Sequence, residues 1–149
     1  MNLLDVNTAQ SADPKANLRE SACISAAHRA LLRWAKVISS RKIEDVLSLY
    51  APDAILVPTL SNEIGEREEE RRRYFEVFLA NEGLQCSITV QKSRVSHKLG
   101  TVVIGGLYTF GFRRDGRPQT VPARFLFTFE EIEGRWLITG HHSSRLSEE

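Results

Sequence analysis

Residues 101–144 read TVVIGGLYTFGFRRDGRPQTVPARFLFTFEEIEGRWLITGHHSS, and the alternation of apolar and polar residues in this stretch decides the fold. A period of two is typical of β-strands with one buried face. Turn signals at Asp115-Gly116 and Glu133-Gly134 divide the stretch into three strands, which we expect at residues 101–113, 119–130 and 135–144. Because both turns are short, these strands are predicted to form an antiparallel meander.

A further strand is predicted at residues 85–97, before the turn signal Leu99-Gly100. Gly105 and Gly106 lie in the middle of the next strand, where glycine indicates a bulge or a sharp bend. A sheet that curls around a pocket needs such a bend. Upstream, AILVP at residues 54–58 reads as a short, fully apolar strand.

Three helices are predicted before the long strands. The first begins at residue 21 and carries one apolar stripe, formed by Ile24, Ala27, Leu31, Trp34 and Ile38. The second covers residues 43–50 and is stopped by Pro52, and the third covers residues 66–79 with Gly83 as its cap. The charge run at residues 66–73 is interpreted as a solvated helix face with near-neighbour ion pairs.

Helices followed by strands indicate an α+β fold. We expect three N-terminal helices packed on a strongly curved, mostly antiparallel sheet that forms a cone with an internal pocket. Residues 1–20 are predicted to be a flexible arm and residues 21–149 a single domain. A chain of 149 residues buries roughly two-thirds of its extended surface on folding, so one core is sufficient.

The charge balance argues against two classes of partner. The chain has 20 Lys and Arg against 19 Asp and Glu, a net charge of +1, which is unlike a protein that coats nucleic acid or an anionic membrane. No apolar run approaches the roughly 20 residues of a membrane span. The first residues carry neither a basic segment nor an apolar segment of a secretory signal, so we expect a cytoplasmic protein.

Polar residues at positions where the pattern predicts core are candidates for a site, because ligand pockets favour concave surfaces such as the open end of a cone. Thr59 and Ser61 follow the strand AILVP, and Tyr74 begins the aromatic face of the third helix. Tyr108 lies in GGLYTFGF, and Arg124 precedes FLFTF. We expect these five side chains to line or border the pocket.

Two histidines followed by two serines end the last predicted strand. Side chains alternate along a strand, so His142 and Ser144 share one face and their neighbours His141 and Ser143 share the other. If Ile138 points inward, His142 and Ser144 do so too. We therefore expect His142 and Ser144 to be the pair that faces the pocket.

Other chemistries lack the residues they need. Adjacent histidines on a strand diverge, and His28 and His97 lie on other predicted elements, so we expect no metal site. A Ser–His–acid triad lacks a nearby acid, and no carboxylate falls at an inward strand position as an isomerase base would. The chain also lacks a phosphate-binding loop and a dinucleotide fingerprint, so we expect no cofactor.

Several motifs together resemble a known family. They are LYAPDAILVPTLSN, YFEVFL, GLYTF, VPARFLFTF and WLITGHHSS, spread over about residues 24–146. Their arrangement resembles the cystatin-like cone of the nuclear-transport-factor-2-like superfamily, in the branch of SnoaL-like proteins and the association domain of calcium/calmodulin-dependent protein kinase II. The order PTLSN, YFEVFL, YTF, ARF and HHSS is similar to the iota class of carbonic anhydrases.

This resemblance implies a metal-independent enzyme that hydrates carbon dioxide reversibly to bicarbonate, with no cofactor. The catalytic residues it implies are Thr59, Tyr74, His142 and Ser144. We expect the substrate-binding residues to be Tyr108, Arg124, Phe78 and Ser61. The superfamily also implies a homo-oligomer that pairs through the sheet. Two alternatives stay open: a non-catalytic ligand-binding or oligomerisation module, and a SnoaL-like isomerase or hydrolase of small molecules.

Overall fold

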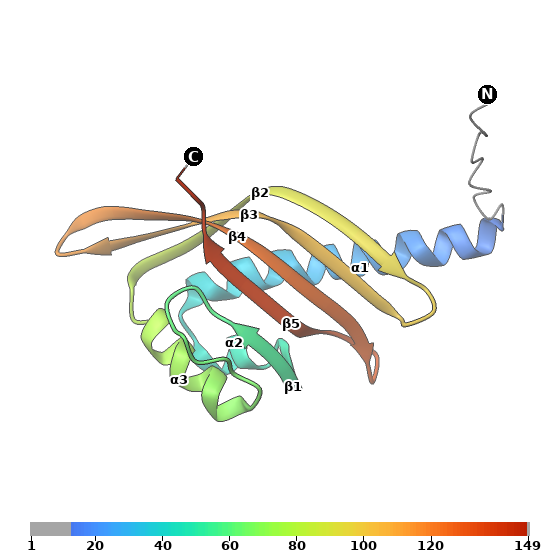
Figure 1. The fold of residues 1–149 in the computed structure, drawn as a ribbon, viewed down its shortest axis with the longest axis horizontal. Helices are drawn as coiled ribbons and strands as arrows, with labels where there is room; N and C mark the ends of the chain where they lie inside the picture. The colour runs from blue at the N-terminus through green and yellow to red at the C-terminus, as the bar shows by residue number, and fades with distance from the viewer. Residues whose placement is uncertain (1–12, 149) are drawn as a thin grey trace, which may run out of the picture.

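The computed structural model describes residues 13–148. In chain order its elements are α1 (Pro14–Ser40), α2 (Ile43–Leu47), β1 (Tyr50–Val57), α3 (Glu68–Phe78), β2 (Glu82–Ser96), β3 (Thr101–Arg114), β4 (Arg117–Ile132) and β5 (Arg135–Arg145). The strands form one sheet in the order β1-β5-β4-β3-β2 (Figure 1). Only β1 pairs in parallel, with β5, and the other neighbours are antiparallel. The predicted α+β fold with a curved, mostly antiparallel sheet is confirmed.

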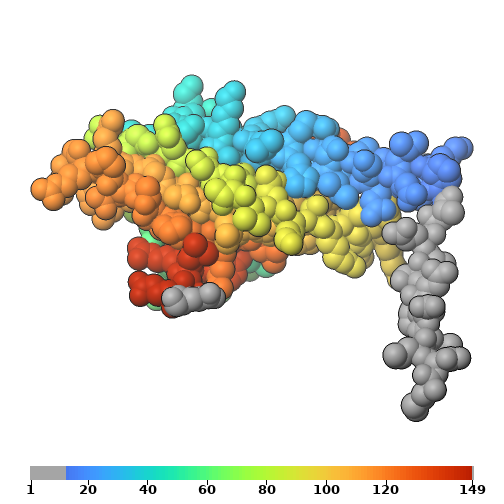
Figure 2. Space-filling model, turned by 90° about the horizontal axis from the view of Figure 1, so that it is seen from above, coloured from blue at the N-terminus to red at the C-terminus, as the bar shows by residue number. Residues whose placement is uncertain are grey.

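The helices cover one face of the sheet. The long helix α1 runs along β2 and β3, while α2 and α3 lie together with β1 on the β5 side of the sheet, at the bottom of Figure 1. Figure 2 shows α1 as a continuous layer along one side of the strands. Its buried residues are four members of the predicted stripe: Ala27, Leu31, Trp34 and Ile38. The interior between α1 and the sheet is therefore the apolar core of the cone.

The first helix begins earlier than the apolar periodicity predicted, at Pro14 rather than at residue 21. The side chain of Asp13 accepts a hydrogen bond from the main-chain N–H of Lys15 at 3.0 Å, and Pro14 occupies the first turn. Asp followed by Pro is a helix-start signal that does not depend on burial. The remainder of the predicted arm, residues 1–12, lies outside the described residues.

Two details of the other helices also differ. The second helix ends at Leu47, because Tyr50 already belongs to β1. Gly83 does not cap the third helix, since α3 ends at Phe78 and Gly83 lies in β2 with a φ of +67°.

A bulge lies beside the glycine pair of β3, but its extra residue belongs to the neighbouring strand β2 and not, as predicted, to β3. The register between β2 and β3 shifts between Ile88 and Val90, opposite Leu107 and its neighbours. A Cβ on Gly106 would lie 1.8 Å from the carbonyl oxygen of Val90, so the strands approach each other more closely than any side chain allows. The extra residue of the bulge is Thr89 of β2, and Gly106 leaves room for the main chain of Val90 that follows it.

Candidate functional site

A bulge in β5 decides which residues face the interior. Phe129 of β4 pairs with Ile138 and Thr128 pairs with Gly140, so Thr139 is an extra residue without a partner in β4. One extra residue inverts the alternation of side chains beyond it. Ile138 therefore points inward, and so does His141, three residues later.

The expectation that His142 and Ser144 face the pocket is wrong. His142 is exposed and Ser144 is half-buried on the outer face of the sheet. Arg124, expected to line the pocket, is also on the outer face, where its Nε donates a hydrogen bond of 2.8 Å to Ser144 Oγ. His141 and Ser143 take the inner positions and are only 5% and 6% exposed.

The inward residues join a chain of hydrogen bonds. Tyr50 Oη lies 2.9 Å from His141 Nδ1, and Tyr108 Oη lies 3.2 Å from His141 Nε2. Tyr108 also donates to Ser143 Oγ at 2.6 Å, and Thr59 Oγ1 donates to the same oxygen at 2.5 Å. Four elements thus contribute, since Tyr50 is in β1, Tyr108 in β3, Ser143 in β5 and Thr59 in the loop after β1.

Burial keeps the titratable side chains of this hydrogen-bond chain uncharged. Burial lowers the pKa of His141 to about 3, with a smaller contribution from His142, so its imidazole is uncharged at ordinary pH. Burial also raises the pKa of Tyr50 and of Tyr108 above the usual range of a phenol. The ring of His141 stacks on Phe127 at 3.9 Å between centroids, which keeps water from that side. The site is a neutral, polar network in an apolar setting.

A small cavity of about 10 Å³ lies beside Ser143 and His141. This volume is close to what one water molecule needs. Its other walls are apolar or aromatic: Trp34, Leu56, Pro58, Tyr74, Phe75, Phe78, Tyr108 and Phe110. The cavity can therefore hold one water-sized group against the Ser143 hydroxyl, surrounded by mostly apolar side chains.

Two larger pockets form the open mouth of the cone, with volumes of about 390 and 670 Å³. Tyr74 and Phe78 line both pockets and the small inner cavity, so these two rings stand between the inside and the mouth. Ser61 lines the smaller pocket and Thr59 the larger one. The structure thus brings together five of the predicted residues, namely Thr59, Ser61, Tyr74, Phe78 and Tyr108.

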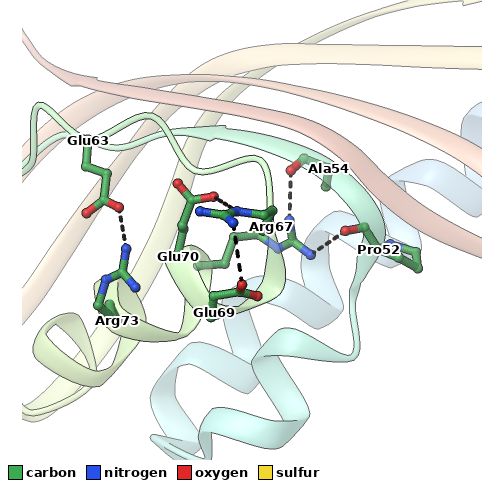
Figure 3. A network of polar contacts seen from close by, with 8 residues as sticks. Pro52, Ala54, Glu63, Arg67, Glu69, Glu70 and Arg73 are labelled. Atoms are coloured by element: carbon green, nitrogen blue, oxygen red, sulfur yellow. Dashed lines mark hydrogen bonds and ion pairs between the residues drawn. The ribbon is translucent and has the colours of Figure 1, made fainter.

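Charged residues of α3 and of the loop before it form ion pairs (Figure 3), and Glu63, Glu70 and Arg73 among them line the smaller mouth pocket. Arg73 pairs with Glu63 at 2.5 Å, and Arg67 pairs with Glu70 at 2.9 Å. The Arg67–Glu70 pair is one of the near-neighbour ion pairs predicted within residues 66–73, whereas Glu63 lies outside that run. Because each carboxylate already has an arginine partner, neither is a free base at the mouth.

Arg71, in the same charge run, is not solvated as predicted but is 2% exposed. Its Nη1 donates to the carbonyl of Ala54 at 2.8 Å, and its Nη2 donates to those of Ala51 and Pro52, both at 3.1 Å. The carbonyls of Pro52 and Ala54 face α3 in Figure 3. Arg71 therefore ties the third helix to the irregular start of β1, which carries Tyr50.

Tyr50, His141 and Ser143 are members of the site that the sequence pattern does not predict. Tyr50 falls within the helix predicted at residues 43–50, and strict alternation along the last strand places His141 and Ser143 on the face opposite to His142 and Ser144. Within residues 13–148, no three His, Cys, Asp or Glu side chains lie close enough to hold a metal ion.

Comparisons with known proteins agree with the fold. The family model for the calcium/calmodulin-dependent protein kinase II association domain matches residues 27–147. A crystal structure of a candidate association domain of this kind, from Xanthomonas campestris, is 34% identical, covers 95% of this chain and 94% of its own, and has a TM-score of 0.73. No curated protein matches the chain.

More distant structures share the fold alone. A nuclear-transport-factor-2-like protein with a cystatin-like fold from Novosphingobium aromaticivorans has a TM-score of 0.78 at 12% identity, with 94% of each chain covered. A candidate dehydratase of that family from Streptomyces avermitilis has a TM-score of 0.74 at 14% identity, covering 86% of this chain and 99% of its own. Among the described helices, none is long and apolar enough to cross a membrane.

Proposed function

The chain belongs to the calcium/calmodulin-dependent protein kinase II association domain family, and from that premise we propose that it hydrates carbon dioxide reversibly to bicarbonate, without a metal, beside Ser143. The observation that carries the proposal is the water-sized cavity against the Ser143 hydroxyl, which accepts hydrogen bonds from Thr59 and Tyr108. The resemblance to iota-class carbonic anhydrases implied Thr59, Tyr74, His142 and Ser144 as catalytic residues. The inward serine is Ser143 rather than Ser144.

The chemistry needs a dry wall and a positioned water. Carbon dioxide is apolar, and the rings of Phe78 and Phe110, which line both the larger mouth pocket and the inner cavity, offer it an apolar surface beside the water-sized space. A water held by the Ser143 hydroxyl attacks the carbon, a C–O bond forms, and one C=O electron pair moves to the carbonyl oxygen. The hydroxyl of Tyr74, which also lines the cavity, donates to the negative charge that develops there.

The proton lost by the water passes to solvent through the mouth of the cone. His141 is a poor acceptor for it, because its pKa is lowered to about 3 and both ring nitrogens already face tyrosine hydroxyls. His142, a catalytic residue implied by the resemblance, is exposed on the outer face of the sheet and does not reach the cavity. Without a metal-bound hydroxide or a good base, we expect turnover well below that of a zinc enzyme.

The test compares two neighbouring serines. Stopped-flow carbon dioxide hydration is measured on chelator-treated protein, on Ser143→Ala and on Ser144→Ala as the matched control. Ser143→Ala removes the inward hydroxyl, so we expect a loss of about 10²-fold, the lower end of losses at oxyanion sites. Ser144→Ala alters only the outer face and should retain the wild-type rate. Tyr74→Phe should lose activity as Ser143→Ala does.

Three results would count against this function. The first is a wild-type rate no higher than buffer, and the second is activity that returns only with added zinc. The third is an equal loss in both serine variants. The mouth pockets of about 390 and 670 Å³ are large enough for a ring-sized ligand, so a chain without hydration activity would favour a SnoaL-like or binding role.

Self-association is a second proposal, favoured by the outer face of the sheet. Ile55 and Leu126 are 50% and 48% exposed there, and their strands both pair with β5. We propose a homodimer that pairs through this face. Sedimentation at micromolar concentration should show a dimer that Leu126→Glu dissociates. Leu99→Glu, at an exposed turn away from this face, is the control that should leave it intact.

A further inference from the structure

We propose that Trp34 and Tyr50, two buried residues that line neither mouth pocket, determine which group donates at each hydrogen bond of the buried chain. As a result, Ser143 donates its hydroxyl proton into the small cavity. The site then favours a ligand that presents a hydrogen-bond acceptor oxygen, such as a carboxylate or bicarbonate oxygen, over a cationic donor. The choice of bicarbonate as a ligand rests on the proposed function, whereas the direction of the hydrogen bonds does not.

Trp34 is the first donor of the hydrogen-bond chain. The indole Nε1–H of Trp34 donates to Tyr50 Oη at 3.0 Å, and an indole nitrogen can only donate. The Tyr50 hydroxyl proton therefore cannot point toward Trp34. Its other partner is His141 Nδ1 at 2.9 Å, so Tyr50 donates its proton there.

The hydrogen bond from Tyr50 determines which ring nitrogen of His141 carries the proton. Because Nδ1 accepts from Tyr50 and the ring is neutral, the ring proton must be on Nε2. Nε2–H then donates to Tyr108 Oη at 3.2 Å, and Tyr108 passes its own proton to Ser143 Oγ at 2.6 Å.

Among the described residues, the hydroxyl proton of Ser143 has no acceptor. Ser143 Oγ accepts from both Tyr108 and Thr59, which occupies its two lone pairs. Within residues 13–148 no side chain accepts the proton of Ser143. Since Ser143 lines the small cavity, its O–H is the donor offered to whatever occupies that cavity.

The reverse direction is disfavoured by burial. If His141 carried its proton on Nδ1, Tyr50 Oη would accept from both His141 and Trp34, and its own proton would have no acceptor. Tyr50 is 4% exposed, so water does not reach this hydroxyl freely. An unsatisfied buried donor disfavours that arrangement by about tenfold to a hundredfold.

Nitrogen-15 NMR of the wild-type protein at neutral pH tests the direction without any carbon dioxide. We expect His141, assigned by comparison with His141→Gln, to be neutral with the proton on Nε2. A ring protonated on Nδ1, or on both nitrogens, would overturn the inference. In Tyr50→Phe the donor to Nδ1 is gone, and the Nδ1–H tautomer should become measurable. An unchanged tautomer in this variant would also overturn it.

Ligand titrations test the acceptor preference. Sodium formate should bind the wild type and compete with bicarbonate, whereas methylammonium chloride should not bind at this site. We expect Ser143→Ala to weaken formate binding by about tenfold and Ser144→Ala to leave it unchanged. Tyr50→Phe should weaken it by about twofold if the two tautomers become equally populated, because only one of them frees the Ser143 proton.

These outcomes separate the two proposals. A protein with the Nε2–H tautomer and Ser143-dependent formate binding but no hydration activity would refute the enzyme and leave the hydrogen-bond direction intact. Hydration activity together with an Nδ1–H tautomer would support the enzyme and refute the hydrogen-bond direction. Binding of methylammonium in place of formate would refute the acceptor preference.

Discussion

Thr59 Oγ1 lies 2.5 Å from Ser143 Oγ, although the two residues are 84 positions apart in the chain. Thr59 lines the larger pocket at the mouth of the cone, and Ser143 lines the water-sized cavity within it. One hydroxyl pair therefore connects the exposed part of the site to the buried chain that runs through Tyr108 and His141.

Replacing Thr59 by valine should remove this connection and keep the shape of the side chain. Ser143 then loses one of its two donors and is free to rotate, so we expect carbon dioxide hydration to fall by about 10²-fold. The melting temperature should change little, because Thr59 is only half-buried. Stopped-flow rates and thermal unfolding on the same preparation check both expectations, and an unaltered rate would remove Thr59 from the site.

The buried histidine should make stability depend on pH. The pKa of His141 is lowered to about 3 in the folded protein, while the unfolded chain binds its proton near pH 6.5, so unfolding is favoured as pH falls below 6.5. The native state should lose about 2 kcal/mol from this group between pH 6.5 and 5. Urea unfolding of His141→Gln should lack this loss, whereas His142→Gln, at an exposed position, should retain it.

A methyl group at the bulge of β2 and β3 should be poorly tolerated. In Gly106→Ala the new Cβ would lie 1.8 Å from the Val90 carbonyl oxygen, so the two strands must separate. We expect a loss of about 3 kcal/mol or more in the free energy of unfolding. Gly111→Ala in the same strand is the control, since its Cβ would meet nothing within 4 Å, and denaturant titration should place it near wild type.

The buried guanidinium of Arg71 should be needed for the fold. Arg71→Met keeps the length of the side chain but leaves the carbonyls of Ala51 and Ala54 without their donors. We expect this to cost about 3 kcal/mol of unfolding free energy. Arg73→Met removes only the ion pair with Glu63, at 57% and 49% exposure, and should cost less than about 1 kcal/mol. Similar losses in both variants would contradict the role assigned to Arg71.

The sequence by itself was enough to predict the α+β class, the antiparallel strands and the apolar face of α1. Those features depend on periodicity and on turns such as Asp115-Gly116, which are local properties of the chain. The close approach of the β2 main chain to Gly106 was also predictable, because a glycine inside a strand indicates such an approach. The residues around the mouth, Thr59 and Tyr74 among them, could be recognised from their positions beside apolar segments.

Only the tertiary structure decided which serine and which histidine face the cavity. The alternation of a strand has a period of two, so the single extra residue at Thr139 moves Ser143 inward and Ser144 outward. That extra residue is accommodated through contacts with the neighbouring strand, where Thr128 and Thr139 share a hydrogen bond of 2.9 Å and a Cβ on Gly140 would lie 2.7 Å from Thr128 Oγ1. Such contacts exist only once β4 and β5 are paired, and local sequence therefore cannot specify them.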